Sequence, residues 1–297
     1  MAEALRGRLL ENEPMAGHVS WRAGGPVARA YFPADLADLG EFLRRLRPDE
    51  PMMMVGLGSN LLVRDGGFDG TMIFTHGAVN AIRREEDGSF YVETGVASPK
   101  VARFVASNGR VGAEFLAGIP GTFGGALAMN AGCYGSETWN HIVRVLMLTR
   151  GGEFVERRRD DFEIGYRHVG LKNVCDEVFA AAWLEFPAGD VEAARARIAE
   201  LLEKRMASQP LDLPNAGSVF RNPGGDHAAR LVEAAGLKGA SEGGARVSEK
   251  HANFIVNPGG AASASEIERL IGRIQAAVRE KFGVELVREV RIVGEAA

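Results

Sequence analysis

The sequence predicts an α+β fold made of hairpins and single helices. Glycine-containing turn signals interrupt alternating apolar residues at Asp87-Gly88 and again at Gly151-Gly152. Single amphipathic helices lie between such strands, without the regular strand–helix–strand repeat of a parallel fold. At 297 residues the chain is long for one hydrophobic core, so we expect two or three subdomains.

Each further element follows from a local signal. In the first part of the chain we expect a short helical opening, a strand over 27–32, a helix capped by Asp35 and running to Arg47, strands over 52–55 and 70–74, and a hairpin over 81–95. The middle part is expected to form a helix begun by Ser98 and ended by Asn108-Gly109, a short helix within 121–130, a hairpin over 142–155 and a strand over 178–186. The last part is expected to form helices over 191–206, 228–235 and 266–282 and a strand over 285–293. Ser265 and Glu268 have the spacing of a capping box at the start of the last helix.

The composition is typical of an ordinary soluble protein. It is 46% hydrophobic and 25% charged, and a formal net charge of -4 gives no sign of a nucleic-acid surface. Cys133 and Cys175 show neither metal-ligand spacing nor a disulfide framework, so we expect no metal and a reducing compartment. No signal-peptide core and no membrane-spanning segment are present, which predicts a cytoplasmic protein without a membrane partner.

The segment 112–137 is rich in glycine and almost uncharged. It is not expected to be a surface helix, because each glycine costs roughly 1 kcal/mol relative to alanine in a helix interior. It is also too apolar for a flexible linker. Backbone N–H groups that no side chain covers form an anion site, so a phosphate-bearing cofactor would suit this segment. A tight packing turn between core elements is the alternative explanation.

A second glycine cluster, Gly56-Leu57-Gly58-Ser59-Asn60, directly follows the predicted strand over 52–55. A Rossmann dinucleotide site is disfavoured here, because leucine stands at position 61 where that fingerprint requires glycine. No long helix with a ribose-binding acid follows either. Two uncharged glycine clusters in one chain favour cofactor binding over packing turns.

The motifs, taken in order, carry a resemblance to a known family. They are RAGGP at 22–26, GLGSNLLVRD at 56–65, AGIPGTFGGALAMNAGCYGSE at 117–137, GYR at 165–167, GSVFRNP at 217–223, EKHANFIVN at 249–257 and REV at 288–290. With these the chain resembles the UDP-N-acetylenolpyruvoylglucosamine reductase family over essentially its whole length. The resemblance implies the shorter subtype, because no counterpart of the longer subtype's tyrosine loop lies between Tyr166 and Ser218.

The resemblance also implies a domain organisation and an activity. An FAD-binding domain of the vanillyl-alcohol-oxidase (PCMH) type is expected in two subdomains, 1–70 and 71–207, followed by an α+β substrate-binding domain over 208–297. The implied enzyme is an NADPH-dependent oxidoreductase that reduces the enolpyruvyl ether of UDP-N-acetylglucosamine-enolpyruvate to UDP-N-acetylmuramate for peptidoglycan, and hence for cell shape and division. FAD is expected to be non-covalent and the protein monomeric.

Site residues follow from the same resemblance. Arg167, Ser218 and Glu289 are the implied catalytic residues, and Tyr166 and Asn222 the implied substrate contacts. The implied FAD contacts come from the two glycine clusters and are Gly56, Leu57, Gly58, Ser59, Asn60, Gly118, Ile119, Pro120, Gly121, Thr122, Gly124 and Gly125. His251 and Asn253 are expected to tie loops rather than to touch ligands.

The chemistry of the reaction suits the three implied catalytic residues. Hydride addition to the terminal carbon builds negative charge toward the substrate carboxylate, which a planar guanidinium such as Arg167 matches at two points. Glu289 beside that carboxylate must be protonated or bridged by arginine, so we expect a raised pKa for it. A hydroxyl such as Ser218 can protonate the neighbouring, strongly basic carbon. Taken singly, each residue is more often a turn hydroxyl, a surface ion-pair partner or a solvent-facing strand residue.

One departure and two competing hypotheses remain. Val169 stands two residues after Arg167, where the family commonly has serine, and valine donates no hydrogen bond. An alcohol or sugar oxidase of the same flavin fold is one alternative function, although neither glycine cluster contains a histidine for covalent attachment. A non-catalytic module that binds sugar nucleotides is the other.

Overall fold

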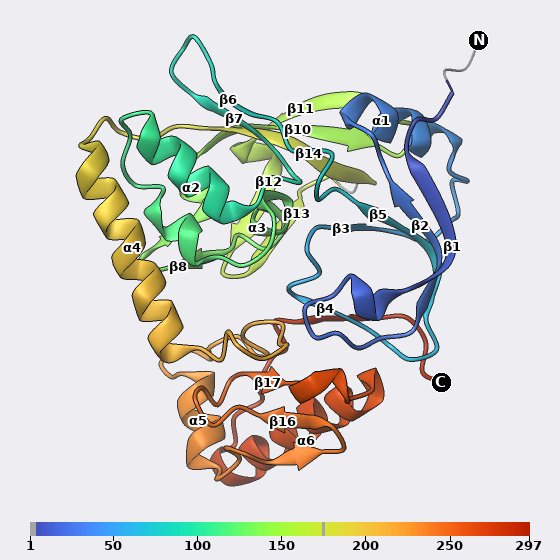
Figure 1. Cartoon of the computed structure of the whole chain (residues 1–297), viewed down its shortest axis with the longest axis vertical. Helices are drawn as coiled ribbons and strands as arrows, with labels where there is room; N and C mark the ends of the chain where they lie inside the picture. Colours follow the sequence, from blue (N-terminus) through green and yellow to red (C-terminus); the bar gives the residue numbers. More distant parts are fainter. Residues whose placement is uncertain (1–3, 174–175) are drawn as a thin grey trace. The chain divides into compact units, whose positions relative to one another are not determined.

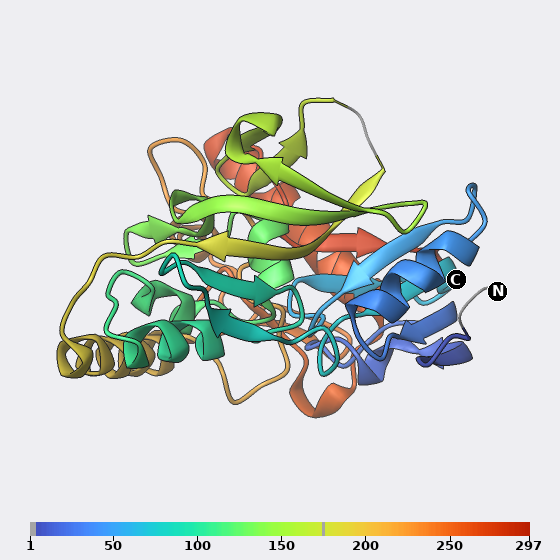
Figure 2. The same ribbon diagram turned by 90° about the horizontal axis from the view of Figure 1, so that it is seen from above.

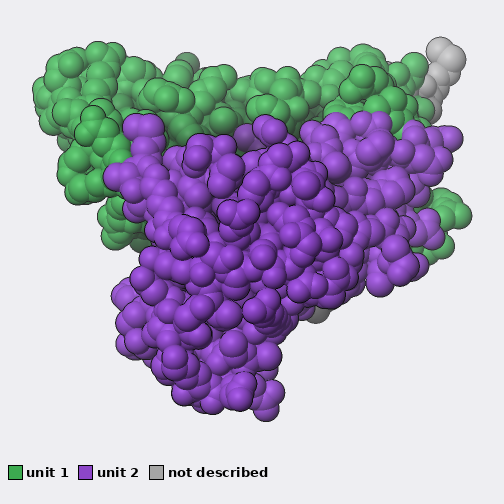
Figure 3. Space-filling model, turned by 60° about the horizontal axis from the view of Figure 1, so that its bottom comes forward, with its two compact units in different colours: residues 1–10, 30–56, 71–204 green, residues 11–29, 57–70, 205–297 purple. Residues whose placement is uncertain are grey.

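The computed structural model describes residues 4–173 and 176–297, so Cys175 lies outside the described residues. The chain forms two compact units, which Figure 3 shows in different colours. Unit 1 comprises residues 1–10, 30–56 and 71–204, and unit 2 comprises residues 11–29, 57–70 and 205–297. Both units mix helices with strands, as the α+β prediction requires.

Unit 1 is built on a five-stranded sheet with the order β11-β10-β14-β7-β6. Its strands are β6 (Ile82–Arg84), β7 (Phe90–Glu93), β10 (Ile142–Thr149), β11 (Phe154–Arg158) and β14 (Glu177–Leu184), all paired antiparallel. The long antiparallel strands are prominent in Figure 2. Both predicted hairpins, β6–β7 and β10–β11, are confirmed.

Helices and short hairpins complete unit 1. They are α2 (Ser98–Ser107), η2 (Glu114–Gly118), α3 (Phe123–Ala128), β8 (Gly132–Cys133), β9 (Ser136–Glu137), η3 (Thr138–Asn140), η4 (Arg159–Asp161), β12 (Phe162–Gly165), β13 (His168–Leu171) and most of α4 (Val191–Ser208). Figure 1 labels α2, α3, α4, β8, β12 and β13. One hydrophobic core joins α2, α3 and the sheet, with Val101, Leu127 and Val145 fully buried. The prediction that Ser98 caps α2 is wrong: the capping position is Ala97. Ser98 lies one residue inside the helix, where its buried hydroxyl has no hydrogen-bond partner among the residues that the structure describes.

The N-terminal part of the chain forms a strand where the sequence predicted a helix. The expected helical opening is wrong, because residues 8–14 form the strand β1 (Arg8–Pro14) at the edge of a sheet with the order β1-β2-β5-β3. The other members are β2 (Pro26–Phe32), β3 (Met52–Val55) and β5 (Phe68–Phe74), with β3 parallel to β5. α1 (Leu36–Arg45) begins as predicted, since the Asp35 carboxylate accepts the Asp38 N–H at 2.9 Å.

Unit 2 combines two helices with short strands. These are η1 (Met15–Gly17), β4 (Leu61–Val63), α5 (Ala228–Ala234), β15 (Ser241–Glu242), β16 (Ala245–Val247), β17 (Ile255–Val256), η5 (Pro258–Gly260), α6 (Ala264–Phe282) and β18 (Arg291–Val293). The last strand is shorter than predicted and pairs in parallel with β4, placing Arg291 opposite Leu61. A second core under α6 includes Trp21, Leu62 and Phe220.

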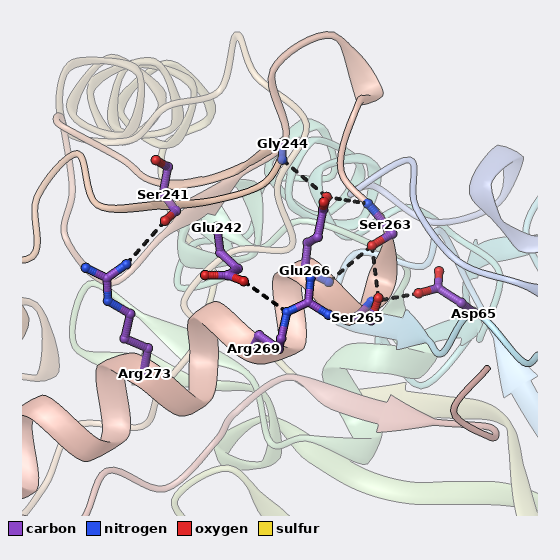
Figure 4. A network of polar contacts seen from close by, with 9 residues as sticks. All are labelled: Asp65, Ser241, Glu242, Gly244, Ser263, Ser265, Glu266, Arg269 and Arg273. Carbon is purple, nitrogen blue, oxygen red and sulfur yellow. Dashed lines mark hydrogen bonds and ion pairs between the residues drawn. The ribbon is translucent and has the colours of Figure 1, made fainter.

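The start of α6 lies two residues before the predicted one. Ser263, not Ser265, is the capping residue: its hydroxyl accepts the Glu266 N–H at 3.2 Å, and the Glu266 carboxylate accepts the Ser263 N–H at 3.0 Å. The Asp65 carboxylate accepts the next N–H groups, those of Ala264 at 2.9 Å and Ser265 at 2.8 Å, as Figure 4 shows around Ser265. Both serines have a glutamate three residues on, so the sequence pattern cannot choose between them.

Glu268, the predicted capping partner, instead forms a two-point ion pair with Arg64. The Nε and Nη2 atoms of Arg64 each lie 2.8 Å from a carboxylate oxygen of Glu268. Hydrogen bonding to this guanidinium holds the pKa of Glu268 below its usual range. A carboxyl whose pKa is lowered on folding stabilises the folded state above its unfolded pKa, and this contribution is lost as the pH falls through the folded pKa.

We therefore predict that Glu268→Gln lowers the free energy of unfolding by about 1 kcal/mol at pH 7, and that the difference from the wild type shrinks toward zero in acid. Urea denaturation at a series of pH values measures it. Glu280→Gln, an exposed glutamate of the same helix, serves as the control. A deficit that stays constant with pH would show that packing, not the ion pair, is lost.

Candidate active site

The glycine-rich segment of unit 1 is held against the start of α2 and the residues just before it by backbone hydrogen bonds. Ser98 N–H donates to the Gly121 carbonyl at 3.1 Å, and Phe123 N–H donates to the Val96 carbonyl at 2.7 Å. The backbone of Gly121 has φ +98°, a conformation that residues other than glycine rarely adopt. Within the described chain, the N–H groups of Gly121 and Gly125 donate to no acceptor. The loop therefore has backbone donors available for an anion.

Gly56, the one residue of the second glycine cluster that belongs to unit 1, lies against the glycine-rich segment there. A Cβ atom at Gly56 would lie 2.2 Å from the Thr122 hydroxyl oxygen. The side chain of Thr122 is buried, so it has no room to move away. Gly56 is thus required for a close approach between the end of β3 and the start of α3.

The glycines of this loop differ in what requires them. A Cβ at Gly124 would lie 2.7 Å from the Cβ of Thr94, and one at Gly118 would lie 2.6 Å from the ring of Tyr134. These two are packing glycines, as the alternative explanation supposed. Gly125, by contrast, is exposed, and apart from its chain neighbours and its own helix no atom of the described residues lies within 4 Å of its added Cβ. Ile119 turns its side chain into the core, so only its backbone faces outward.

This arrangement fits the diphosphate of FAD. Uncharged loops with free backbone N–H groups bind phosphate oxygens without a dedicated cationic side chain. Open space over Gly125 leaves room for the ligand, and the close packing at Gly118 and Gly124 keeps the loop rigid. Among the described residues, no group of three or more His, Cys, Asp or Glu side chains is placed to hold a metal ion.

Arg167 lies in the turn between β12 and β13 with φ +54°. Its Nη2 donates to the Gly132 carbonyl at 2.8 Å and its Nη1 to the Asn130 carbonyl at 3.5 Å, and its guanidinium lies 5.0 Å from the ring centre of Tyr166. Tyr166 itself is 49% exposed. These two contacts orient the planar guanidinium through backbone carbonyl oxygens, which are neutral acceptors.

Asn130 braces this turn and was not predicted from the sequence. It is fully buried, its Nδ2 donates to the Gly165 carbonyl at 3.2 Å, and its Oδ1 accepts the Trp139 N–H at 3.1 Å. The only signal in the sequence was an asparagine within the motif at 117–137.

Val169, at the position where the family commonly has serine, lies opposite Ile164 and packs against the core of unit 1. Its apolar contacts explain why valine is tolerated there.

In unit 2, the segment after Ser218 pairs with the segment around Glu289. Glu289 N–H donates to the Val219 carbonyl at 2.8 Å, and Arg221 N–H donates to the Val287 carbonyl at 2.9 Å. This short antiparallel pairing, in which Phe220 lies opposite Arg288, joins the segment that follows Ser218 to the segment that contains Glu289. Arg167 belongs to unit 1.

The second glycine cluster is fastened to the same pairing. Asn60 Nδ2 donates to the Glu289 carbonyl at 3.1 Å, and the Asn60 carbonyl accepts the Arg291 N–H at 3.0 Å. A Cβ at Gly58, where φ is +59°, would lie 2.2 Å from the His18 carbonyl oxygen, so packing alone requires this glycine. Leu57 is 39% exposed, and Ser59 is partly exposed between these fixed points. The Asn60 amide therefore positions the backbone of Glu289 in addition to any ligand contact.

Asn222, predicted to contact the substrate, has a structural partner. Its Oδ1 accepts the Ala228 N–H at 3.1 Å, at the start of α5. Asn253 ties loops, as expected: its amide contacts the backbone of Phe220.

No helix among the described residues is long and apolar enough to span a bilayer.

Comparison with known proteins decides the family. The C-terminal domain of UDP-N-acetylenolpyruvoylglucosamine reductase matches residues 209–293, and an FAD binding domain matches residues 27–157. The UDP-N-acetylenolpyruvoylglucosamine reductases of Thiobacillus denitrificans and Methylococcus capsulatus are each 55% identical to the chain. The alignments cover 99% of this chain and 94% of the first relative, and 98% of this chain and 95% of the second. The chain belongs to the UDP-N-acetylenolpyruvoylglucosamine reductase family.

Solved structures agree. The UDP-N-acetylenolpyruvylglucosamine reductase of Thermus caldophilus matches with a TM-score of 0.81 and 28% identity, over 97% of this chain and 99% of that one. The 6-hydroxy-D-nicotine oxidase of Arthrobacter nicotinovorans matches with a TM-score of 0.56 and 12% identity, over 96% of this chain and 89% of that one, which concerns the fold alone.

Membership of this reductase family settles the activity. The chain is an FAD-dependent oxidoreductase that uses NADPH and reduces UDP-N-acetylglucosamine-enolpyruvate to UDP-N-acetylmuramate, a step of peptidoglycan biosynthesis. The family, the fold class with its FAD-binding and C-terminal domains, the cofactor and the activity predicted from the sequence are confirmed. The alternative functions, an alcohol or sugar oxidase and a non-catalytic module, are not those of these relatives.

Because Asn130 links the Arg167 turn to the core through buried hydrogen bonds, we predict that Asn130→Ala lowers the free energy of unfolding by about 2–3 kcal/mol. Urea denaturation measures the change. The matched control is Asn80→Ala, an exposed asparagine whose Nδ2 donates to the Gly77 carbonyl at 2.9 Å. Its effect is expected within about 0.5 kcal/mol. Equal effects of the two substitutions would contradict the bracing role.

Proposed function

We propose that Ser218 and Glu289 act with Arg167 on the enolpyruvyl group during the reduction. The observation that carries this proposal is the backbone pairing between Val219 and Glu289 in unit 2. This pairing supports the proposal because Ser218 directly precedes Val219, whose carbonyl accepts the Glu289 N–H. The hydrogen bond from Asn60 to the Glu289 carbonyl adds a fixed connection between this pair and the second glycine cluster.

The two glycine clusters are proposed to hold FAD without a covalent bond. FAD, when bound, supplies the hydride for the reduction. The N–H groups of Gly121 and Gly125 would bind diphosphate oxygens, with Gly56 to Asn60 and Gly118 to Thr122 as further contacts. Gly124 would contribute through backbone position alone, since Thr94 occupies the space beside it.

Each catalytic side chain has one proposed task. The Arg167 guanidinium neutralises charge that builds toward the substrate carboxylate, and donors aimed at developing charge are each worth roughly 2.7–4 kcal/mol of barrier. Glu289, with the raised pKa expected for it, shares that site without a second full negative charge. The Ser218 hydroxyl gives its proton to the carbon beside the carboxylate, which completes the saturated lactyl ether.

The domain organisation and surroundings belong to the same proposal. Residues 1–70 and 71–207 would carry FAD as two subdomains, and residues 208–297 would bind the sugar nucleotide, with Tyr166 and Asn222 as further contacts. NADPH and the sugar nucleotide would use one site in turn. The protein would act as a monomer in the cytoplasm, where NADPH and nucleotide sugars are made. It would have no membrane or nucleic-acid partner.

We predict that Ser218→Ala leaves FAD reduction by NADPH within about twofold of wild type and slows reoxidation by the enolpyruvyl substrate about 100-fold or more, because a general acid contributes roughly 10²–10⁴. Anaerobic stopped-flow absorbance of the flavin measures both half-reactions. Ser241→Ala, an exposed serine of unit 2, is the control. If Ser218→Ala slows both half-reactions equally, the serine has a structural role only.

For the cofactor, we predict that Gly125→Val weakens FAD binding at least about tenfold, the cost of about 1.4 kcal/mol of lost contact. The apo-protein should fold as well as wild type, because the added side chain meets open space. Gly272→Val, at an equally open and exposed helical glycine in α6, is the control. Gly121 is unsuitable because its φ strains any side chain. Fluorescence titration with FAD measures the affinity, and unchanged binding would overturn this placement.

A further inference from the structure

A buried asparagine of unit 2 holds the backbone that follows Ser218. Asn253 is 4% exposed. Its Nδ2 donates to the Phe220 carbonyl at 2.8 Å, its Oδ1 accepts the Phe220 N–H at 3.0 Å, and its own carbonyl accepts the Val219 N–H at 2.9 Å. A primary amide fits this task because it offers a donor and an acceptor in one plane, matching both polar groups of a peptide residue.

The opposite side of the same backbone faces Glu289. The Val219 carbonyl accepts the Glu289 N–H at 2.8 Å, while the Val219 N–H is bound by Asn253. Val219 therefore lies between the two, and Asn253 completes a chain of hydrogen bonds that ends at Glu289. The side chains of Val219 and Phe220 are buried, which prevents this backbone from shifting.

Ser218 has little support of its own. Within the described chain, its peptide N–H and carbonyl make no backbone hydrogen bond. On the preceding side, Gly217 N–H donates to the Asn215 Oδ1 at 3.0 Å, and Gly217 has φ +74°. The position of Ser218 is therefore set by its neighbours, and Asn253 makes the contacts to those that follow it.

Asn253 is itself fixed within the turn over 248–254. Its N–H donates to the His251 Nδ1 at 3.3 Å, and the Ser248 hydroxyl accepts the Lys250 N–H at 3.1 Å and the His251 N–H at 3.3 Å. Burial lowers the pKa of His251, which keeps the imidazole neutral and its Nδ1 able to accept. The amide of Asn253 is thus presented to Phe220 in one orientation.

We propose that Asn253 is a positioning residue for the reduction of the enolpyruvyl substrate, acting through Ser218 without touching the substrate. The inference rests on the proposed role of Ser218 as proton donor. Its physical basis is that a displacement of about 1 Å at a reacting group costs on the order of 100-fold in rate. A loop held at Val219 and Phe220 keeps the hydroxyl at one distance from the carbon that it protonates.

A matched control exists in the same unit. Asn257 is fully buried and also makes two side-chain hydrogen bonds, from its Nδ2 to the Trp21 carbonyl at 2.8 Å and from Ala262 N–H to its Oδ1 at 2.8 Å. Neither contact involves residues 217–221. Asn253→Ala and Asn257→Ala remove equivalent contacts, so a comparison between them separates positioning from loss of stability.

The test is anaerobic stopped-flow measurement of both half-reactions on FAD-loaded enzyme. We expect Asn253→Ala to reduce FAD with NADPH within about twofold of wild type and to slow reoxidation by the enolpyruvyl substrate about 10- to 100-fold. Its solvent deuterium isotope effect on reoxidation should rise, because proton transfer becomes rate-limiting. Asn257→Ala should show neither change. If the two variants behave alike, the inference is overturned.

The Asn253→Ala, Ser218→Ala double variant tests whether Asn253 acts through the serine. We expect it to reoxidise no more slowly than Ser218→Ala alone; multiplied defects would overturn the inference. If Ser218→Ala by itself leaves the rate of reoxidation unchanged, the result contradicts the proposed role of Ser218 as proton donor, on which the inference about Asn253 rests. Should Asn253→Ala not fold, Asn253→Asp retains the acceptor for Phe220 N–H and loses the donor, and the same slowing of reoxidation is expected.

Discussion

The parallel pairing of β18 with β4 is the constraint on which the candidate catalytic pair depends. The end of the chain returns to residues 61–63, directly after the second glycine cluster, and places Arg291 opposite Leu61. The residues just before β18 must then run beside Asn60 and Val219, because Glu289 is hydrogen-bonded to both. Three motifs that are far apart in the sequence thereby share one rigid part of unit 2.

Neutral amides do much of the positioning around charged or reactive groups. Asn130 holds the turn of Arg167, Asn60 holds the backbone of Glu289, and Asn253 holds the backbone after Ser218. An amide satisfies buried peptide groups without adding a charge that would compete with the guanidinium or the carboxylate. Charged side chains have a different place in unit 2, where Arg64 and Asp65 bind Glu268 and the start of α6.

The glycines of the two clusters meet two different requirements, close packing of the chain and open space for a ligand. Gly58, Gly118 and Gly124 are required because another atom of the chain lies where a Cβ would be, whereas Gly125 faces open space. A sequence shows all of them as equal members of a glycine-rich motif. Only the positions of Thr94, Tyr134 and His18 distinguish a packing glycine from one that leaves room for a ligand.

The sequence by itself determined the family, the α+β class, the β6–β7 and β10–β11 hairpins of unit 1 and most helices, because turn residues, apolar periodicity and motif order are local properties. Tertiary structure decided the rest. It made a strand of residues 8–14 by pairing it at a sheet edge. It made Ser263 the capping residue of α6, because Asp65 binds the N–H of Ser265 and Arg64 binds the carboxylate of Glu268. It also assigned tasks to Asn130 and Asn253, since a buried amide acquires a role only when the backbone that it binds is folded beside it.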